Sequence, residues 1–147
     1  MFSLKYQTIV AAPPEVVFQK VTGYPVTGQI RGEELQDKYG KYLSGEGPSL
    51  TFREDVGGGV TWECFFEPPN RRTMRTVDST WSDRIDQFIA TPQGTLWEIT
   101  WEVKAGAATT LTKWLAYHLF TKRSIGRRMI QPVLRDIYES SRAPNTH

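Results

Sequence analysis

The segment from Ala107 to Arg142 is the sequence feature that most constrains the fold of this chain. Its apolar residues recur three, four and seven positions apart, the spacing of one face of an amphipathic helix; they are Leu111, Leu115, Leu119, Ile130, Val133, Leu134 and Ile137. Pro132 removes one backbone donor inside the segment, so we expect the helix to kink there. About 36 residues at about 1.5 Å each would reach roughly 54 Å, so the helix must cross the body of the protein or bend.

Most of the chain before this helix alternates between apolar and polar residues, which is the period of a β-strand. The alternation is cleanest at 97–103, where one face is expected to be dry and the other wet, as in an antiparallel sheet covered on one side. The same pattern, with the Gly- and Pro-rich turns that interrupt it, predicts further strands at 2–10, 42–43, 49–53, 60–66, 72–77 and 85–90.

The alternation leaves two possibilities for which side chains of the strand at 85–90 point inside. An even loop at 92–94 places Phe88 inside, whereas an odd loop places Ile85 and Ile89 inside. The sequence leaves this choice open.

Short helices are expected between the first strand and the remaining ones. Pro14 suits a first helical turn, and Gly23 stops the helix after a short buried face of Val17, Phe18 and Val21. Residues 27–41 are polar and punctuated by glycine, and they predict a second short helix around 33–38. Helices packed on one face of an antiparallel sheet make an α+β architecture.

Composition sets few further limits. The chain has 147 residues, so we expect a single domain over 1–147. Its formal net charge is +2, which by itself does not predict binding to nucleic acid or to a membrane. Cys64 is the only cysteine, which rules out an internal disulfide and fits a reducing, cytoplasmic location. The first ten residues lack the apolar run of a secretory signal, and no segment is long and apolar enough to span a bilayer.

Three local motifs follow one another along the chain. The first strand runs into Ala12-Pro13-Pro14-Glu15-Val16-Val17-Phe18, a turn follows at Glu67-Pro68-Pro69-Asn70-Arg71-Arg72, and Gly94-Thr95-Leu96 opens the tryptophan-rich strand. In this order the motifs resemble the START / Bet v 1-like (SRPBCC) superfamily, and specifically its polyketide cyclase/dehydrase-like branch. The resemblance covers nearly the whole chain and departs from the family between Gly28 and Gly47.

The resemblance implies a helix-grip fold, in which a curved antiparallel sheet of about six or seven strands wraps on a long C-terminal helix, with one or two short helices after the first strand. It also implies a cavity between sheet and helix for a small apolar or amphipathic ligand, such as a lipid, a polyketide or an isoprenoid. The superfamily includes both enzymes and non-catalytic carriers, so the fold does not choose between them.

The large apolar residues at inward positions are the candidate ligand contacts. A buried tryptophan needs a partner for its N–H, and several in one layer are hard to pack closely, so we expect a ligand-sized space among them. The candidates are Trp62, Phe66, Met74, Phe88, Trp97, Ile99 and Trp101 on the strands, with Tyr117 on the helix. For any one of them, ordinary core packing is the alternative.

The candidate acid–base residues are His118, Tyr117 and Arg84, with Asp86 as a further polar contact. For His118 a structural or surface role is favoured over catalysis, because a single residue is a weak signal. No Cys, His or carboxylate cluster has the spacing of metal ligands, and no serine lies in a nucleophile-elbow pattern, so we expect neither a metal nor another cofactor. Cys64 lies on the apolar side of its strand and is expected to behave as a small hydrophobic residue. A ligand carrier is therefore favoured over a cyclase, dehydratase or hydrolase.

A basic run on the C-terminal helix supports a third hypothesis, a module that docks on protein or RNA. Its residues are Lys122, Arg123, Arg127 and Arg128. Such a run is most often the solvated face of a helix, but it could also meet an anionic membrane surface or a phosphate backbone. No specific nucleic acid is predicted, and the chain is expected to be a monomer or a homodimer.

Overall fold

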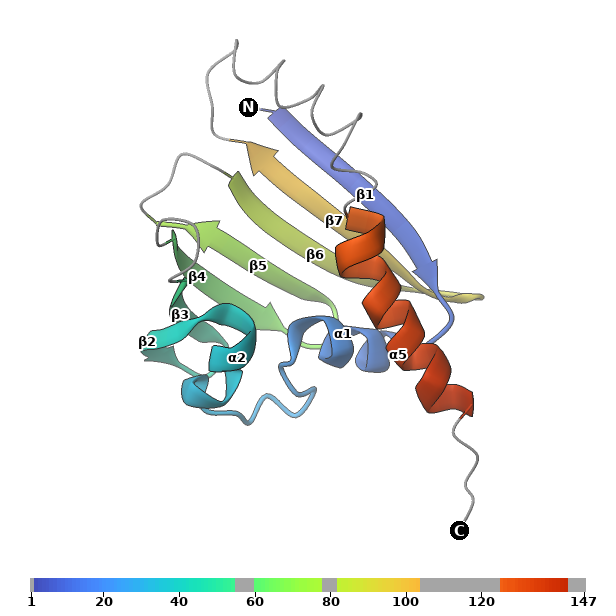
Figure 1. Ribbon diagram of the computed structural model, residues 1–147, viewed down its shortest axis with the longest axis horizontal. Helices are drawn as coiled ribbons and strands as arrows, with labels where there is room; N and C mark the ends of the chain where they lie inside the picture. Colours follow the sequence, from blue (N-terminus) through green and yellow to red (C-terminus); the bar gives the residue numbers. More distant parts are fainter. Residues whose placement is uncertain (1, 55–59, 78–81, 104–124, 143–147) are drawn as a thin grey trace.

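Seven antiparallel strands form one sheet, and the described helices pack on one face of it (Figure 1). The computed structural model describes residues 2–54, 60–77, 82–103 and 125–142. The strands are β1 (Phe2–Val10), β2 (Lys41–Glu46), β3 (Ser49–Glu54), β4 (Val60–Glu67), β5 (Arg71–Thr76), β6 (Ser82–Thr91) and β7 (Gly94–Val103). The helices are α1 (Pro14–Thr22), η1 (Gly32–Leu35), α2 (Gln36–Tyr39), η3 (Ile125–Ile130) and α5 (Gln131–Arg142).

The strand order is β1-β7-β6-β5-β4-β3-β2, so every neighbouring pair except β1–β7 is a hairpin. All the strands predicted from the alternation are present, and β2 is an edge strand with a register shift between Tyr42 and Ser44. The α+β class and the antiparallel sheet are therefore confirmed.

The facing of β6 follows from its short turn to β7. Thr91 pairs with Gly94, which makes the turn even, and Phe88 then lies opposite Trp97 on the covered face. Phe88 is buried, whereas Ile89 is 45% exposed on the other face. The even-loop solution is the correct one.

The short helices lie where the sequence predicts them. In α1, Val17, Phe18 and Val21 are buried, and the helix ends at Gly23, whose left-handed backbone has a φ of 73°. In η1 and α2, Leu35 and Tyr39 are buried and continue the core. The ring of Phe18 meets the ring of Phe88 edge to face at 5.5 Å, which joins α1 to β6.

The C-terminal part of the predicted long helix is helical in two pieces. A π-helical turn, η3, passes into α5 at Gln131, one residue before Pro132, whose missing N–H interrupts the ordinary ladder of helical hydrogen bonds. Ile130 and Ile137 are buried against the sheet, as the apolar stripe predicts. Residues 107–124 lie outside the described part of the chain. In that part, no helix is long and apolar enough to cross a membrane.

Gly94 occupies a position that no other residue fits. Its φ is +134°, and a Cβ added there would lie 2.2 Å from the carbonyl oxygen of Val10. We expect Gly94→Ala to lower the free energy of unfolding by roughly 2–4 kcal/mol, from backbone strain and steric overlap together. Urea unfolding followed by circular dichroism measures it.

The matched control is Gly47→Ala. Gly47 also has a positive φ, of +59°, but a Cβ there would meet no atom within 4 Å. Gly47→Ala should lower the free energy of unfolding by only about 1 kcal/mol, because only the left-handed backbone is unfavourable for alanine. Equal losses for the two variants would show that the contact with Val10 is unimportant.

Candidate ligand-binding site

The covered face of the sheet carries two neighbouring rows of side chains, fixed by the strand register. One row contains, from β1 to β3, Leu4, Trp101, Arg84, Met74, Cys64 and Leu50. The next row contains, from β1 to β4, Tyr6, Ile99, Asp86, Arg72 and Phe66. Charged residues thus lie at the centre of a face that is otherwise largely apolar.

Asp86 is completely buried and accepts four hydrogen bonds from three residues. Its Oδ1 accepts from Arg72 Nη2 at 2.9 Å and from Arg84 Nε at 2.8 Å. Its Oδ2 accepts from Arg84 Nη2 and from Trp97 Nε1, both at 2.9 Å. Burial by itself would raise the pKa of Asp86, but Arg72, Arg84 and these hydrogen bonds hold the pKa well below its usual range. The carboxylate is therefore charged.

Arg72 connects this carboxylate to the helices. The guanidinium is buried, and its Nη1 donates to the Tyr39 hydroxyl on α2 at 2.8 Å. The Tyr39 hydroxyl in turn donates to the carbonyl oxygen of Thr22, at the end of α1, at 2.5 Å. Burial raises the pKa of Tyr39 to about 12, so the phenol stays neutral and can donate. Among the described residues, Arg72 Nε has no hydrogen-bond partner.

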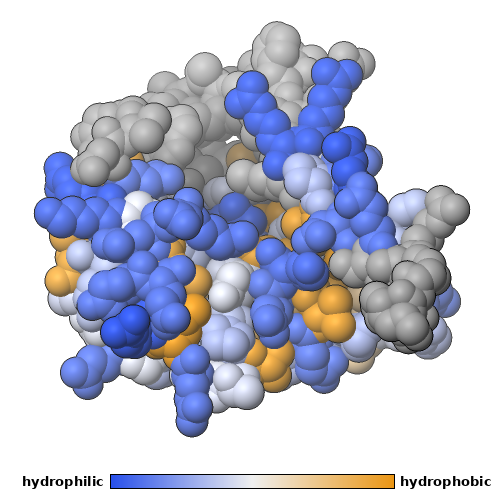
Figure 2. All heavy atoms as spheres, turned by 60° about the horizontal axis from the view of Figure 1, so that its bottom comes forward, coloured by the Kyte–Doolittle hydropathy of each residue, from blue (hydrophilic) through white to orange (hydrophobic). Residues whose placement is uncertain are grey.

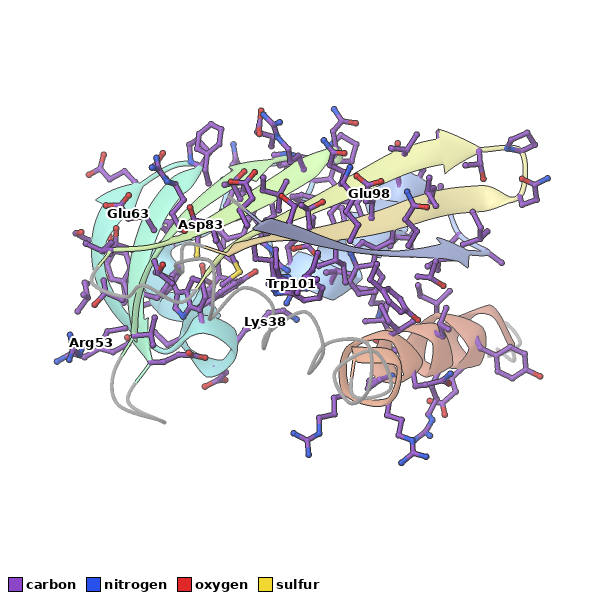
Figure 3. The ribbon with its side chains drawn as sticks, turned by 90° about the horizontal axis from the view of Figure 1, so that it is seen from above. Lys38, Arg53, Glu63, Asp83, Glu98 and Trp101 are labelled. Carbon is purple, nitrogen blue, oxygen red and sulfur yellow. The ribbon has the colours of Figure 1, made fainter. Side chains whose placement is uncertain are left out.

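The side chains beside this cluster remain partly open. Trp101, Met74 and Trp62 are half-buried at the edge of the core. The Arg84 guanidinium lies over the Trp101 ring, 5.7 Å from its centroid. In Figure 3, Lys38 extends from α2 beneath the sheet toward Trp101. The space-filling view shows the surface hollowed near the centre of the molecule, with apolar residues exposed beside the hollow (Figure 2).

Lys38 has an unusual electrostatic environment. Its side chain reaches water, yet its stem packs beside the end of α1, with Cδ 3.3 Å from where a Cβ on Gly23 would lie. Burial lowers the pKa of Lys38, and the nearby positive charges of Arg72 and Arg84 lower it further. No ion pair or hydrogen bond joins Lys38 to a residue that the structure describes.

Four of the predicted ligand contacts belong to the packed core. They have at most 2% of their surface exposed and are Phe66, Phe88, Trp97 and Ile99. Phe66 stacks on the Tyr24 ring at 4.4 Å, and Phe88 stacks on Trp97. These four form the closed floor beside the hollow, and their part in ligand contact stays a prediction. Trp62, Met74 and Trp101 are the described candidates with open surface.

The predicted acid–base residues are only partly described. Tyr117 and His118 lie outside the described residues, as do Lys122 and Arg123 of the basic run. Arg84 donates two hydrogen bonds to Asp86, which fix its position. Cys64 is buried, and burial raises the pKa of its thiol to about 12. Arg127 and Arg128 are exposed on η3. Within the described ranges, no three His, Cys, Asp or Glu side chains lie close enough together to hold a metal ion.

Sequence reasoning missed Arg72, Tyr39 and Lys38. A signal for Arg72 was available, because it shares the strand period of Met74, which was placed inside. A charged residue at an inward position next to an inward Asp86 predicts a buried ion pair. Nothing in the polar segment at 27–41 marked Tyr39 or Lys38 as neighbours of that pair.

The seven-stranded antiparallel sheet with helices on one face is consistent with the helix-grip fold that the sequence resemblance implied, and solved structures share this fold. A polyketide-cyclase-like protein from Corynebacterium glutamicum has a TM-score of 0.54 at 16% identity, over 99% of this chain and 96% of its own. A Thermus thermophilus protein has a TM-score of 0.56 at 17% identity, over 95% and 99%. A Mesorhizobium loti protein has a TM-score of 0.56 at 12% identity, over 95% and 98%.

No family model matches the sequence, and no curated protein matches it. At identities this low, similarity to solved structures shows the fold, and the function has to be argued from the site.

Replacing the buried carboxylate tests the cluster. We expect Asp86→Asn to lower the free energy of unfolding by about 3–5 kcal/mol, because it leaves two arginine charges without their partner. Asp136→Asn is the matched control, since Asp136 pairs with Lys20 at 3.1 Å on the surface and should cost less than about 1 kcal/mol. Denaturant unfolding measures both. Equal effects would contradict the central role of Asp86.

The pH dependence of this difference gives a second test. Because the pKa of Asp86 lies below its ordinary 3.8 in the folded protein, its stabilisation is fully present above that value. It is lost as the pH falls further, toward the folded-state pKa. The difference in unfolding free energy between the wild type and Asp86→Asn should therefore stay constant from neutral pH to the ordinary value and shrink below it. A difference that already shrinks near neutral pH would show a protonated carboxyl.

Proposed function

We propose that this protein binds a small hydrophobic or amphipathic molecule in the hollow between the sheet and its helices. The observation that carries the proposal is the arrangement of Trp101, Met74 and Trp62. They keep open apolar surface on the same face of the sheet where Ile99 and Phe66 are fully buried. Open apolar side chains beside a closed floor, with a few fixed polar groups, are typical of ligand sites.

The fold supports the same proposal, because a sheet that curves around a helix leaves room beside the line of contact. In Figure 3, the left part of the covered face lies over α2 and the right part over α5, and Trp101 is labelled between them. The ligand would lie along Trp101 and Met74.

The described polar groups favour binding over catalysis. General acid–base catalysis needs a group that exchanges a proton near neutral pH. The Asp86 carboxylate stays ionised, and burial raises the pKa of both Tyr39 and Cys64 to about 12. A cyclase or dehydratase would therefore have to draw its acid–base groups from elsewhere, including the predicted Tyr117 and His118.

Filling the hollow tests the proposal. Met74→Trp adds volume on the covered face of β5 and should weaken the binding of the neutral dye Nile red by tenfold or more, about 1.4 kcal/mol or more of binding free energy. Thr73→Trp is the matched control, because Thr73 adjoins Met74 on the opposite face. It should leave the affinity unchanged. Fluorescence titration measures binding, and circular dichroism confirms that both variants fold.

Native mass spectrometry of the purified protein, followed by organic extraction, identifies a ligand carried from the cell. We expect a bound small molecule that organic solvent removes. A wild-type protein that neither carries such a molecule nor binds Nile red, or equal loss of dye binding in Met74→Trp and Thr73→Trp, would rule the proposal out.

A further inference from the structure

We propose that the outer face of the sheet, which is the face opposite the described helices, is the interface of a homodimer. In this dimer β6 of one chain stacks on β6 of a second copy, and a twofold axis parallel to β6 relates the two. The outer face and the hollow lie on opposite sides of the sheet. The inference therefore goes beyond the proposed ligand binding and does not depend on it.

The first argument is the apolar surface exposed on the outer face. In Figure 3 the described helices lie below the sheet, and Glu98 projects from the other side, where no described element packs. Ile9 and Ile89 are 49% and 45% exposed there, on either side of Leu96 in the strand register. Phe65, which is 42% exposed, adds to this surface from β4. Exposed apolar side chains that gather on one face indicate a contact surface.

The second argument is that β6 presents an uncharged strip in the middle of the outer face. From residue 85 to residue 89 its outward side chains are Ile85, Gln87 and Ile89, because the residues between them point to the covered face. Asp83, nearer the start of β6, is buried and accepts a hydrogen bond from the Thr76 N–H at 3.0 Å. An uncharged strip between charged strands is suited to the centre of an interface, where water is excluded.

The third argument is the order of charges on either side of this strip. On each neighbouring strand, the charged residues of the outer face have one sign, and the sign alternates from strand to strand. They are Arg71 and Arg75 on β5, Glu98 and Glu102 on β7, Glu63 and Glu67 on β4, and Lys5 on β1. Because β5 and β4 lie on one side of β6 and β7 and β1 on the other, each side is the charge-reversed image of the other.

A twofold axis along β6 turns this pattern into complementary contacts. The axis exchanges the two sides of β6, so β5 of one copy lies over β7 of the other, and β4 lies over β1. Arg71, Gln87 and Glu98 are neighbours in the strand register, so Arg71 faces the partner's Glu98 at the same level. Stacked sheets lie about 10 Å apart, a gap that two long side chains can bridge. A twofold axis across the strands would instead stack each strand on itself and bring like charges together.

Pairing within one chain accounts for part of the charge order. Arg71 pairs with Glu67 at 2.6 Å, and Glu98 accepts a hydrogen bond from Gln7 at 2.5 Å. Such exposed contacts are weak, and a carboxylate or a guanidinium has enough acceptors or donors to bond to a second partner. Pairing within the chain also gives no reason for the apolar outward side of β6. Stacking of two copies explains both features.

The test reverses the two facing charges. Arg71→Glu and Glu98→Arg should each raise the dissociation constant of the dimer tenfold or more, because each places like charges opposite one another. An equimolar mixture of the two variants should form a heterodimer, since every acidic position then faces a basic one. The double variant should dimerise like the wild type. Sedimentation equilibrium measures the mass, which for the wild type should be twice 16.8 kDa, with a dissociation constant on the order of micromolar.

A second pair of variants tests the apolar strip. Ile89→Lys should also raise the dissociation constant tenfold or more, because it brings a charge into the centre of the contact. Val16→Lys is the matched control, since Val16 is 40% exposed but lies on α1, on the other side of the sheet. It should leave the dimer unchanged. Circular dichroism confirms that each variant is folded, so that a loss of association is not a loss of structure.

Three results would overturn the inference. The first is a wild-type chain that stays monomeric up to about 1 mM. The second is a dimer that both single reversals leave intact, which would place the interface elsewhere. The third is a pair of single variants that lose the dimer and fail to associate when mixed, because the facing of β5 and β7 predicts that they associate. None of these results bears on the proposed ligand binding, which dye titration measures on the covered face.

Discussion

The buried carboxylate of Asp86 is the constraint on which the rest of the structure depends. A charge without exposure to water is tolerated only when donors surround it. Those donors come from β5, β6 and β7, through Arg72, Arg84 and Trp97. A shift of one residue in any of these strands would turn a donor to the opposite face, so the charge also fixes the strand register. The central sheet is thus specified by electrostatics as well as by its apolar pattern.

The same constraint positions the helices. Arg72 donates from Nη2 to Asp86 and from Nη1 to the Tyr39 hydroxyl, and that hydroxyl donates to the carbonyl of Thr22. The ends of α1 and α2 are therefore held over the sheet by a polar chain that starts at one carboxylate. Removing water from this chain strengthens each bond in it and makes each missing partner more costly. The hollow beside it is accordingly bordered by fixed groups on its polar side.

Sequence reasoning predicted the strands, the short helices and the inward tryptophans, because alternation and turn residues are local signals. It could not choose the facing of β6, which depended on whether the turn before Gly94 held an even number of residues. It also missed the ion pair, because arginine is usually exposed and Arg72 becomes visible only when β5 and β6 are aligned. The position of Lys38 could not be predicted for a different reason. This residue lies on a short helix, and no local sequence pattern shows where that helix packs on the sheet.

The protonation states of the buried polar groups bear on whether the site binds a ligand or catalyses a reaction. Catalysis by proton transfer uses groups that change state near neutral pH, whereas recognition uses groups whose state is constant. Burial alone would raise the pKa of Asp86, but Arg72 and Arg84 hold this carboxylate in the charged form, whereas burial keeps the Tyr39 phenol neutral. Both groups are therefore fixed in state as well as in position. Lys38 differs from both, because burial and then the positive charges of Arg72 and Arg84 lower its pKa. Groups of constant state such as Asp86 and Tyr39 suit recognition better than proton transfer.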